Sequence, residues 1–324
     1  MKKFIGVFVS LVFVGVLVYL MRDQVPAVIG VFKNGNRALI GLAALLFLAG
    51  MAFMAYRLKL IFQAKGMRVS FKETLDLTFI GCFFNNFLPT SVGGDVVKAM
   101  CASQITKHPV KSITVIMMDR IFGLFMFILI PSASLLLLRD QVNPKVPVIV
   151  YSFLGFSAAA FFLLFNSSVA KRFHLVENLL NRIKIGSKIR QIYDGLHDFK
   201  NHRGIMVSAM ALSVAGQSLN IFVLYLLAVA LGADSSTLLY FFLLIPVVHL
   251  LSMLPPTLGG LGVREGLYTY FLKGYIGTER AFALGILWLG LLLLSSLIGG
   301  IIYVARSDYH VQFNKKSNPE GQTP

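Results

Sequence analysis

The sequence predicts an all-α integral membrane protein with six transmembrane helices and two re-entrant helical hairpins, arranged as an inverted repeat. Three observations lead to this fold class. Hydrophobic residues occupy 56% of the 324 positions, and the charged residues, 14%, cluster between long apolar runs. A Leu-Pro motif followed by paired glycines occurs twice within such runs. Successive loops also differ in their lysine and arginine content, as they do where loops face two sides of a membrane.

Six apolar stretches have the length of roughly 20 residues that a membrane-crossing helix needs. They cover residues 4–21, 38–56, 112–138, 147–165, 204–231 and 280–305. The first stretch follows two lysines, as a signal peptide would, but it ends without a small-x-small cleavage site. We therefore expect it to be a retained span.

The two copies of the motif interrupt apolar segments that would otherwise be continuous helices. Leu88–Gly94 reads LPTSVGG, and Leu254–Gly260 reads LPPTLGG. Non-helical backbone at membrane depth is tolerated only where it is buried in protein or lines a wet cavity. Each motif therefore predicts the turn of a re-entrant hairpin, the first over residues 73–106 and the second over residues 237–273.

Basic residues set the orientation of the chain. With the N-terminus inside, 21 of the 30 lysines and arginines fall on the cytoplasmic side and 7 on the other, while Arg120 and Arg264 lie within the membrane. The count includes a cytoplasmic loop at 57–72, with Arg57 as its first residue. The excess of basic residues on one side predicts that the N- and C-termini are both cytoplasmic.

Each half of the chain then reads span, span, hairpin, span, in opposite orientations, which is the organisation of an inverted-repeat transporter. Residues 1–138 form the first repeat, 139–305 the second, and 306–324 a polar cytosolic tail. Within the second repeat, 166–203 is a basic cytosolic segment with leucines at helical spacing. We interpret it either as an amphipathic helix on the membrane surface or as a solvated connector.

Few ionisable residues fall inside the predicted membrane region. They are Asp95, Asp119, Arg120, Arg264 and Glu265. Such groups are costly in a bilayer and are therefore candidates for a functional site. The arginines are suited to bidentate contacts with phosphate oxygens, and the carboxylates to holding the arginines or exchanging protons. The alternative is an ion-pair cluster that joins the two hairpins without touching a ligand.

Paired glycines precede the returning arm of each hairpin. Gly93 and Gly94 come before Asp95, and Gly259 and Gly260 come shortly before Arg264. Glycine permits a tight turn and close approach to a ligand. The arm that follows begins with unsatisfied N–H groups and a positive helix end. Together these features predict a site for a phosphate or carboxylate head group.

Other polar residues of the apolar segments allow more than one interpretation. Asn85 and Asn86 precede the first break, where they either cap or line a cavity or form interhelical hydrogen bonds. His249, Gln217 and Asn220 are interpreted as packing residues.

The sequence offers no cofactor, metal or enzyme motif. The two cysteines form no metal-ligand pattern, and the common hydrolase, metalloprotease and nucleotide-binding motifs are absent. The net charge of +16 does not indicate nucleic acid, because the basic residues are spread over loops between spans. We therefore expect no cofactor, no metal and no nucleic-acid partner.

Three segments together resemble the signature of a known family. They are Asn86–Asp95 (NFLPTSVGGD), Asp119-Arg120, and Pro256–Glu265 (PTLGGLGVRE). They are similar to the lysylphosphatidylglycerol synthase transmembrane-region family, also called the flippase-like domain family, and the resemblance covers about residues 4–305. In the multiple peptide resistance factor that gives the family its name, this membrane domain flips an aminoacylated phospholipid that a separate soluble domain makes.

The resemblance implies a transporter of an anionic phospholipid or a polyisoprenyl-linked lipid head group in the bacterial inner membrane. Its substrate-binding residues would be Asn86, Gly93, Gly94, Asp95, Asp119, Arg120, Gly259, Gly260, Arg264 and Glu265. This sequence has no soluble synthase domain, so lysyl transfer is not expected. The alternatives are a membrane enzyme or subunit of lipid or lipid-linked glycan synthesis, and a scaffold for a lipid-synthesis enzyme. The lipid, the direction of movement, the coupling ion and the oligomeric state are left open.

Overall fold

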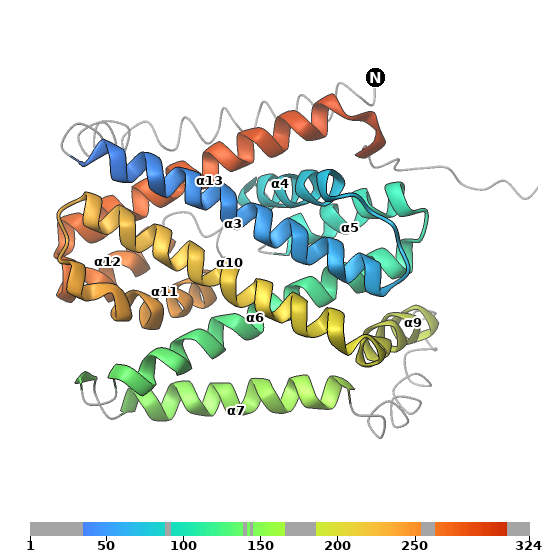
Figure 1. The fold of residues 1–324 in the computed structure, drawn as a ribbon, viewed down its shortest axis with the longest axis horizontal. Coiled ribbons are helices and arrows are strands. Elements are labelled where there is room, and N and C mark those ends of the chain that lie inside the picture. Colours follow the sequence, from blue (N-terminus) through green and yellow to red (C-terminus); the bar gives the residue numbers. More distant parts are fainter. Residues whose placement is uncertain are drawn as a thin grey trace, which may run out of the picture.

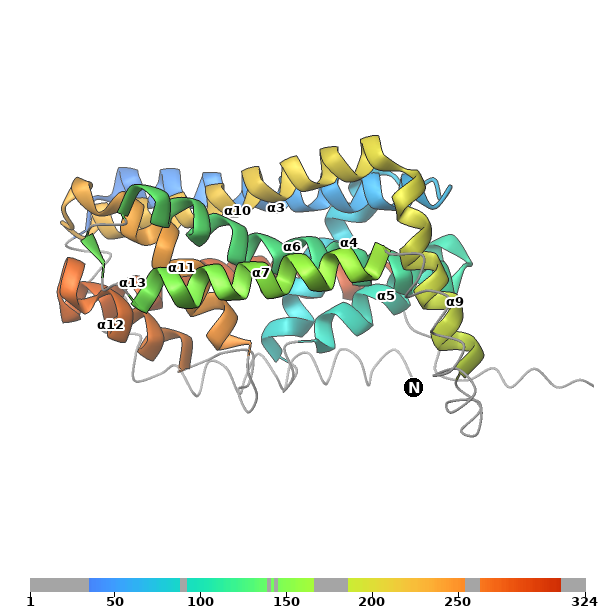
Figure 2. The ribbon, with the colours of Figure 1, turned by 90° about the horizontal axis from the view of Figure 1, so that it is seen from below.

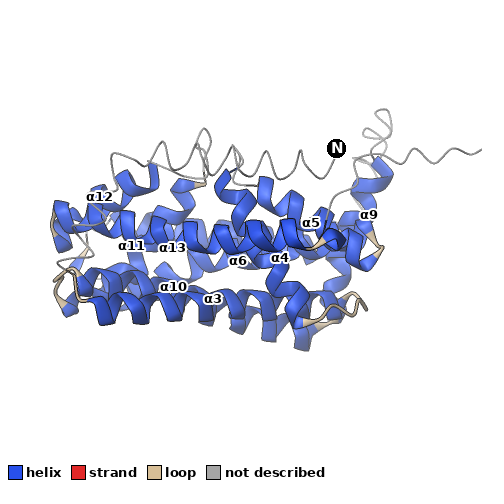
Figure 3. Ribbon diagram, turned by 90° about the horizontal axis from the view of Figure 1, so that it is seen from above, coloured by secondary structure: helices blue, strands red, loops and turns tan. Residues whose placement is uncertain are grey.

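The computed structural model describes residues 35–87, 92–138, 141–142, 145–165, 186–253 and 263–309. Within these ranges the chain forms only helices and the loops between them (Figure 3). The α-helices are α3 (Arg37–Ala64), α4 (Phe71–Phe87), α5 (Gly93–Thr106), α6 (Pro109–Leu138), α7 (Lys145–Phe165), α9 (Gly186–His197), α10 (Arg203–Ala230), α11 (Leu238–Ser252), α12 (Val263–Ile276) and α13 (Thr278–Ala305). The 3-10 turns are η3 (Asp198–Asn201), η4 (Ser235–Thr237) and η5 (Ser307–Tyr309). The prediction of an all-helical membrane protein is confirmed.

Four long helices, α3, α6, α10 and α13, form the frame of the molecule (Figure 1). Each has 28 to 30 residues, which corresponds to about 42–45 Å at 1.5 Å per residue. Helices α3 and α10 lie side by side along their whole length (Figures 1 and 3). Small residues permit this contact, since Gly50 of α3 faces Asn220 of α10. The side chain of Asn36 caps the start of α3 by accepting from the amides of Ala38 and Leu39.

Five segments are long and apolar enough to cross a membrane. They are Arg37–Ala64, Pro109–Leu138, Arg203–Ala230, Ser235–Ser252 and Thr278–Ala305. Four of them match predicted spans. The remaining segment, Ser235–Ser252, belongs to the predicted second hairpin. The predicted span 147–165 corresponds to α7, in which the stretch meeting the apolar criterion is the shorter Val146–Ala159. The predicted first span, 4–21, lies outside the described residues.

Both predicted interruptions separate two shorter helices. Helix α4 ends at Phe87 and α5 begins at Gly93, while α11 ends at Ser252 and α12 begins at Val263. The members of each pair pack on each other, and the two pairs occupy opposite ends of the long helices (Figure 1). The motif segments 88–91 and 254–262, with Gly259 and Gly260, lie outside the described residues. That each pair enters and leaves the membrane on one side stays a prediction.

The predicted loop at 57–72 is wrong in its first part. Helix α3 continues to Ala64, and Arg57 is buried with an exposed fraction of 8%. The apolar run ends at Tyr56, but the residues that follow are good helix formers until Gly66, which adopts the left-handed conformation that ends the helix. A basic residue assigned to a loop therefore belongs to the protein interior.

The described part of the 166–203 segment packs on the protein. Helix α9 lies across the direction of the long helices at the end where α10 begins (Figure 2). Leu196 and Phe199 are buried there in one apolar cluster with Val115 of α6. Asp198 accepts a hydrogen bond from Lys65 at 2.8 Å. The leucines predicted to face a membrane surface lie outside the described residues.

The predicted polar tail at 306–324 begins with packed residues rather than free ones. Tyr309 of η5 is buried, and its hydroxyl donates to Asp76 Oδ2 of α4 at 2.9 Å. Arg306 also donates to Asp76, and Cys101 donates to the carbonyl of Tyr309 at 3.3 Å. The end of α13 is thereby fixed to the first helix pair; residues 310–324 lie outside the described residues.

Candidate functional site

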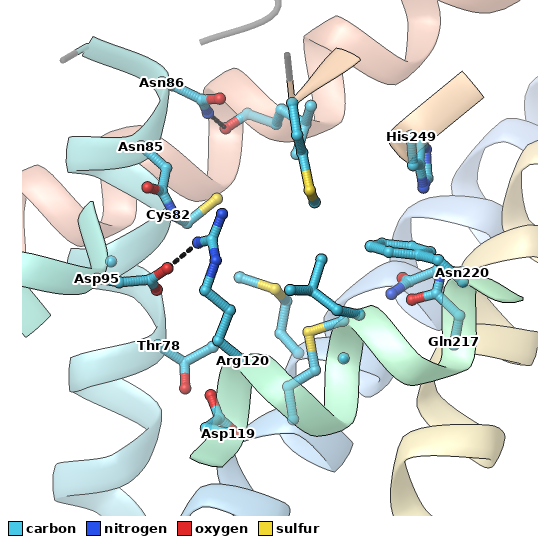
Figure 4. Close-up of a pocket in the computed structure, with 18 of the residues that line it drawn as sticks. Thr78, Cys82, Asn85, Asn86, Asp95, Asp119, Arg120, Gln217, Asn220 and His249 are labelled. Carbon is cyan, nitrogen blue, oxygen red and sulfur yellow. Dashed lines mark hydrogen bonds and ion pairs between the residues drawn. The ribbon is translucent and has the colours of Figure 1, made fainter. Parts of the chain in front are cut away.

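A cavity of about 360 Å³ lies among eight helices, between the two helix pairs (Figure 4). Its lining includes charged residues from α3, α5, α6 and α12, and neutral polar residues from α4, α10 and α11. The charged lining residues are Arg57, Asp95, Lys98, Asp119, Arg120 and Arg264. Four cations thus oppose two carboxylates in the lining, and Glu265, 3.6 Å from Arg264, lowers the net formal charge from +2 to +1. A membrane cavity with this excess favours an anionic ligand.

Asp119 of α6 is held by two cations. Its Oδ1 accepts from Arg57 Nε at 2.8 Å, and its Oδ2 accepts from Lys98 Nζ at 3.0 Å. Arg57 also donates to Ser213 Oγ of α10 at 3.0 Å. This network joins α3, α5, α6 and α10 at one place in the interior. The prediction that the intramembrane carboxylates hold Arg120 and Arg264 is therefore wrong for Asp119, which binds Arg57 and Lys98 instead.

Arg120, the next residue along α6, points to a different carboxylate. Its guanidinium forms an ion pair with Asp95 Oδ2 of α5 (Figure 4). Consecutive residues of a helix point about 100° apart, so Asp119 and Arg120 cannot serve the same partner. The Asp95 and Arg120 side chains are 20% and 25% exposed, which is more than the residues around Asp119. This ion pair confirms the expectation that an acidic residue positions Arg120.

Arg264 and Glu265 begin the second returning arm and are both buried. Arg264 Nη2 and Glu265 Oε1 are 3.6 Å apart, within ion-pair range but beyond a hydrogen bond. Among the described residues, Arg264 Nε and Nη2 make no hydrogen bond. A buried guanidinium with open donors is a strong candidate for binding an anion.

Gly94 of the first motif has a packing role at the start of α5. Gly94 lies so close to α4 that a Cβ there would be 2.3 Å from the carbonyl oxygen of Gly81. Its amide donates to Asn85 Oδ1 at 2.9 Å, and the amides of Asp95 and Val96 donate to the carbonyl of Val92. The prediction that this helix end offers free N–H groups to a phosphate is therefore wrong for these three residues. Gly93 is half-buried at the same helix start and, like Gly94, is not among the cavity-lining residues.

Neutral polar residues line the rest of the cavity. Asn86 lines it and also donates to Ser296 Oγ of α13 at 2.6 Å, so both interpretations of this residue hold. His249 pairs with the hydroxyl of Tyr268 at 2.9 Å. Gln217 and Asn220 of α10 are buried and face the cavity from the side opposite Asp95 (Figure 4). They were predicted as packing residues, but both are part of the cavity lining.

Sequence reasoning missed Arg57 and Lys98 as members of the charged network. The signal was present, because Arg57 precedes the helix-ending Gly66 and Lys98 follows Asp95 by one helical turn. In the described ranges, no group of three His, Cys, Asp or Glu residues is placed to hold a metal ion. The site chemistry that these residues support is anion binding by arginine and lysine.

Comparison with known proteins agrees with this picture. Residues 4–300 match the family model described as "Lysylphosphatidylglycerol synthase TM region". A UPF0104 membrane protein of Archaeoglobus fulgidus is 23% identical to this chain over 305 residues, covering 88% of the chain and 90% of the relative. Since the match extends over nearly the whole chain and includes the helices that form the cavity, this protein belongs to the lysylphosphatidylglycerol synthase transmembrane-region family.

Proposed function

We propose that the protein is a lipid transporter that moves an anionic lipid head group between the two leaflets of the membrane. The observation that carries this proposal is the cavity with an excess of cations, which lies between two helix pairs that come from opposite ends of the bundle. An inverted-repeat transporter binds its substrate at such a place, near the middle of the membrane between the repeats.

The phosphate of the lipid would bind to Arg264 first. Its Nε and Nη2 atoms have no hydrogen-bond partner among the described residues, and they form the planar fork that suits two phosphate oxygens. Arg120 lines the same cavity, and Asp95 fixes its orientation. Asp119 plays a different part, because it neutralises two cations that would otherwise repel each other beside the ligand.

The cavity size supports binding of the head group alone. A volume of about 360 Å³ lies in the lower range of small-molecule pockets. An acyl or prenyl chain that spans one leaflet is about 15 Å long, half of the hydrocarbon core of about 30 Å. The tails would therefore stay in the bilayer while the head group crosses the protein.

Alternating access would follow from motion of one helix pair against the long helices. Helix α4 crosses α5 at Gly94 and α13 at Gly299, where an added Cβ would be 2.1 Å from the carbonyl oxygen of Phe79. Contacts this close make α4 a rigid link between the first pair and α13. The first pair and α13 would then form one body against which α11 and α12 move, and because α13 also packs on α12, the moving surface would lie between those two helices.

The expected setting is the bacterial inner membrane, with both termini cytoplasmic and membrane lipids as the partners. The charge distribution over the loops supports this orientation. A cytosolic or membrane enzyme of lipid synthesis is a further candidate partner. In this proposal the protein itself carries out transport and no covalent chemistry.

Arg264→Gln tests the proposal. Purified protein would be reconstituted in vesicles that contain phosphatidylglycerol with a fluorescent acyl chain. Dithionite added outside quenches the label in the outer leaflet, so transfer would be measured as the rate at which inner-leaflet fluorescence becomes quenched. We expect the initial rate to fall about tenfold or more, since one charge-assisted contact contributes about 1.5–3 kcal/mol.

Two further variants complete this test. Arg264→Lys keeps the positive charge beside Glu265 but loses the planar fork of the guanidinium. Its transfer rate should therefore lie between those of wild type and Arg264→Gln. The control is Ser134→Ala, which removes a buried α6 hydroxyl that donates to the carbonyl of Ile130 outside the cavity lining. Wild-type transfer rates in both Arg264 variants would refute the proposal, as would wild-type vesicles that transfer no faster than protein-free vesicles.

A further inference from the structure

The cavity has two chemically different sides. Figure 4 shows Asp95 and Arg120 on one side, and Gln217, Asn220 and His249 on the other. The first side carries charge, whereas the second has neutral groups only. Arg264 lines the same cavity. A ligand that fills the cavity therefore meets cations at one part and neutral polar groups at the other.

The neutral side contains two buried amides with atoms that lack a partner. Gln217 and Asn220 are each 7% exposed, and Gln217 Nε2 and Asn220 Oδ1 make no hydrogen bond among the described residues. They lie three residues apart on α10 and so share one face of the helix. An unsatisfied buried polar atom costs about 1–3 kcal/mol, and two of them beside a cavity indicate that a ligand or water supplies the missing partners.

The remaining polar group on this side is already occupied. His249 Nε2 is 2.9 Å from the Tyr268 hydroxyl, and the imidazole ring stacks on Trp288 with centroids 5.9 Å apart. Phe47 contacts Trp288 edge to face at 5.4 Å. These aromatic rings form a packed wall next to the two amides.

Among the described residues, each carboxylate at the cavity already lies beside a cation of the protein. Asp119 is bound by Arg57 and Lys98, Asp95 by Arg120, and Glu265 lies in ion-pair range of Arg264. A lysyl or other ammonium head group would therefore enter a region of net positive charge without a counter-ion, which is unfavourable at low dielectric.

We propose that the lipid recognised by this cavity carries a phosphate and, beyond it, a neutral hydroxylated group such as a polyol or sugar, and that cationic aminoacyl head groups are excluded. This inference rests on the proposed transport function and specifies its substrate class. A hydroxyl both donates and accepts, so it can pair with the amides of Gln217 and Asn220, which line the cavity, in either orientation of each amide.

The experiment compares three lipids with identical acyl chains. Phosphatidic acid supplies the phosphate alone, phosphatidylinositol adds a neutral polyol, and lysyl-phosphatidylglycerol adds cationic groups. Native mass spectrometry of the full-length protein with equimolar mixtures measures which lipid stays bound. We expect wild-type protein to retain phosphatidylinositol about tenfold better than phosphatidic acid, as two satisfied neutral hydrogen bonds would give. Lysyl-phosphatidylglycerol should be retained least.

Two near-isosteric variants separate recognition from folding. Gln217→Met and Asn220→Leu should each reduce the preference for phosphatidylinositol over phosphatidic acid by about threefold or more and leave retention of phosphatidic acid unchanged. Neither should lower the thermal midpoint, because an apolar side chain replaces an unsatisfied buried amide. Ser134→Ala serves again as the control outside the cavity lining and should keep the wild-type preference.

The outcomes distinguish this inference from the transport function. If lysyl-phosphatidylglycerol is retained as well as phosphatidylinositol, or if both variants keep the wild-type preference, the substrate class is wrong while vesicle transport of phosphatidylglycerol can still succeed. Loss of the preference together with a lowered thermal midpoint in both variants would assign the amides to packing and also overturn the inference. The opposite result, selective binding without transfer in vesicles, would refute transport and leave the recognition intact.

Discussion

The two helix pairs use their buried charges differently. Around α5, Asp119 binds Arg57 and Lys98 at 2.8 and 3.0 Å, which closes a network across four helices. In α12, Arg264 lies 3.6 Å from its own neighbour Glu265 and keeps two nitrogens without a hydrogen bond among the described residues. The first pair therefore has the character of a stabilised scaffold, whereas the second keeps the donors to which we assign ligand binding in the proposed function.

This difference shows that two copies of one motif need not have the same role. Both copies interrupt a helix and bring charged residues to the same cavity. The first copy leads into α5, where the backbone amides of Gly94, Asp95 and Val96 donate hydrogen bonds to other groups of the protein. A site that binds and releases a substrate needs open donors on at least one side and a rigid support on the other.

The largest effect should come from Asp119→Asn. The change leaves Arg57 and Lys98 buried beside each other without a counter-charge, and breaking a buried ion pair in this way costs about 3–5 kcal/mol. We expect a large drop in the thermal midpoint of the detergent-purified protein and in its yield. Ser134→Ala should behave like wild type. If the Asp119→Asn protein had a wild-type thermal midpoint, the charges around Asp119 would not stabilise the first pair. The proposed difference between the Asp119 network and Arg264 would then be wrong.

A smaller effect should follow from Gly94→Ala. The new Cβ would lie 2.3 Å from the Gly81 carbonyl oxygen and 2.6 Å from the Asn85 amide nitrogen, so α4 and α5 must separate. Overpacking of this kind costs about 1–3 kcal/mol. Gly266→Ala in α12 is the matched control, because no atom of the described residues lies within 4 Å of an added Cβ there.

The two glycine variants should shift the thermal midpoint in opposite directions. In the interior of a helix, alanine is favoured over glycine by about 0.5–1 kcal/mol, so Gly266→Ala should raise the midpoint slightly. Equal shifts in the two variants would show that the first pair is no more tightly packed than the second.

The smallest effect should come from the ion pair between Lys65 and the half-exposed Asp198. The hydrogen bond from Lys65 lowers the pKa of Asp198 below its usual value. A depressed pKa contributes stability above the unfolded pKa of about 3.9, and this contribution is lost as the pH falls through the folded pKa. Asp198 is half exposed, so the contribution is at most about 1 kcal/mol.

Asp198→Asn isolates this contribution. At pH 7 the variant should have a slightly lower thermal midpoint than wild type, and the difference should shrink as the pH is lowered toward 3. A difference that grows on acidification would contradict the assigned sign. The loss of thermal midpoint in Asp198→Asn at pH 7 can also be compared with the loss in Asp119→Asn, whose ion pairs are buried.

Much of the fold could be predicted from apolar runs and helix breakers. The interruptions after Phe87 and Ser252 were found from proline and paired glycine, since these residues disrupt helices locally. The extent of α3 was missed, because the end of an apolar run is not the end of a helix. Arg57 was placed in a loop for that reason, although the helix carries it into the interior.

The partners inside the site could be predicted only in part. The pairing of Asp95 with an arginine follows from two unlike charges at membrane depth, but the partner of Asp119 depends on how α3 and α5 are rotated against α6. Gln217 and Asn220 were taken for packing residues, because periodicity places them on one face of α10 without saying what that face meets.

The amino-acid sequence by itself determined that this chain is helical, that it belongs in a membrane and where two of its helices break, because these properties depend on local composition and local backbone chemistry. Only the tertiary structure decided which charges neutralise each other, which donors stay open and which neutral amides complete the cavity. Those outcomes depend on distances between helices far apart in the chain, and a few ångströms separate the closed network at Asp119 from the open guanidinium of Arg264.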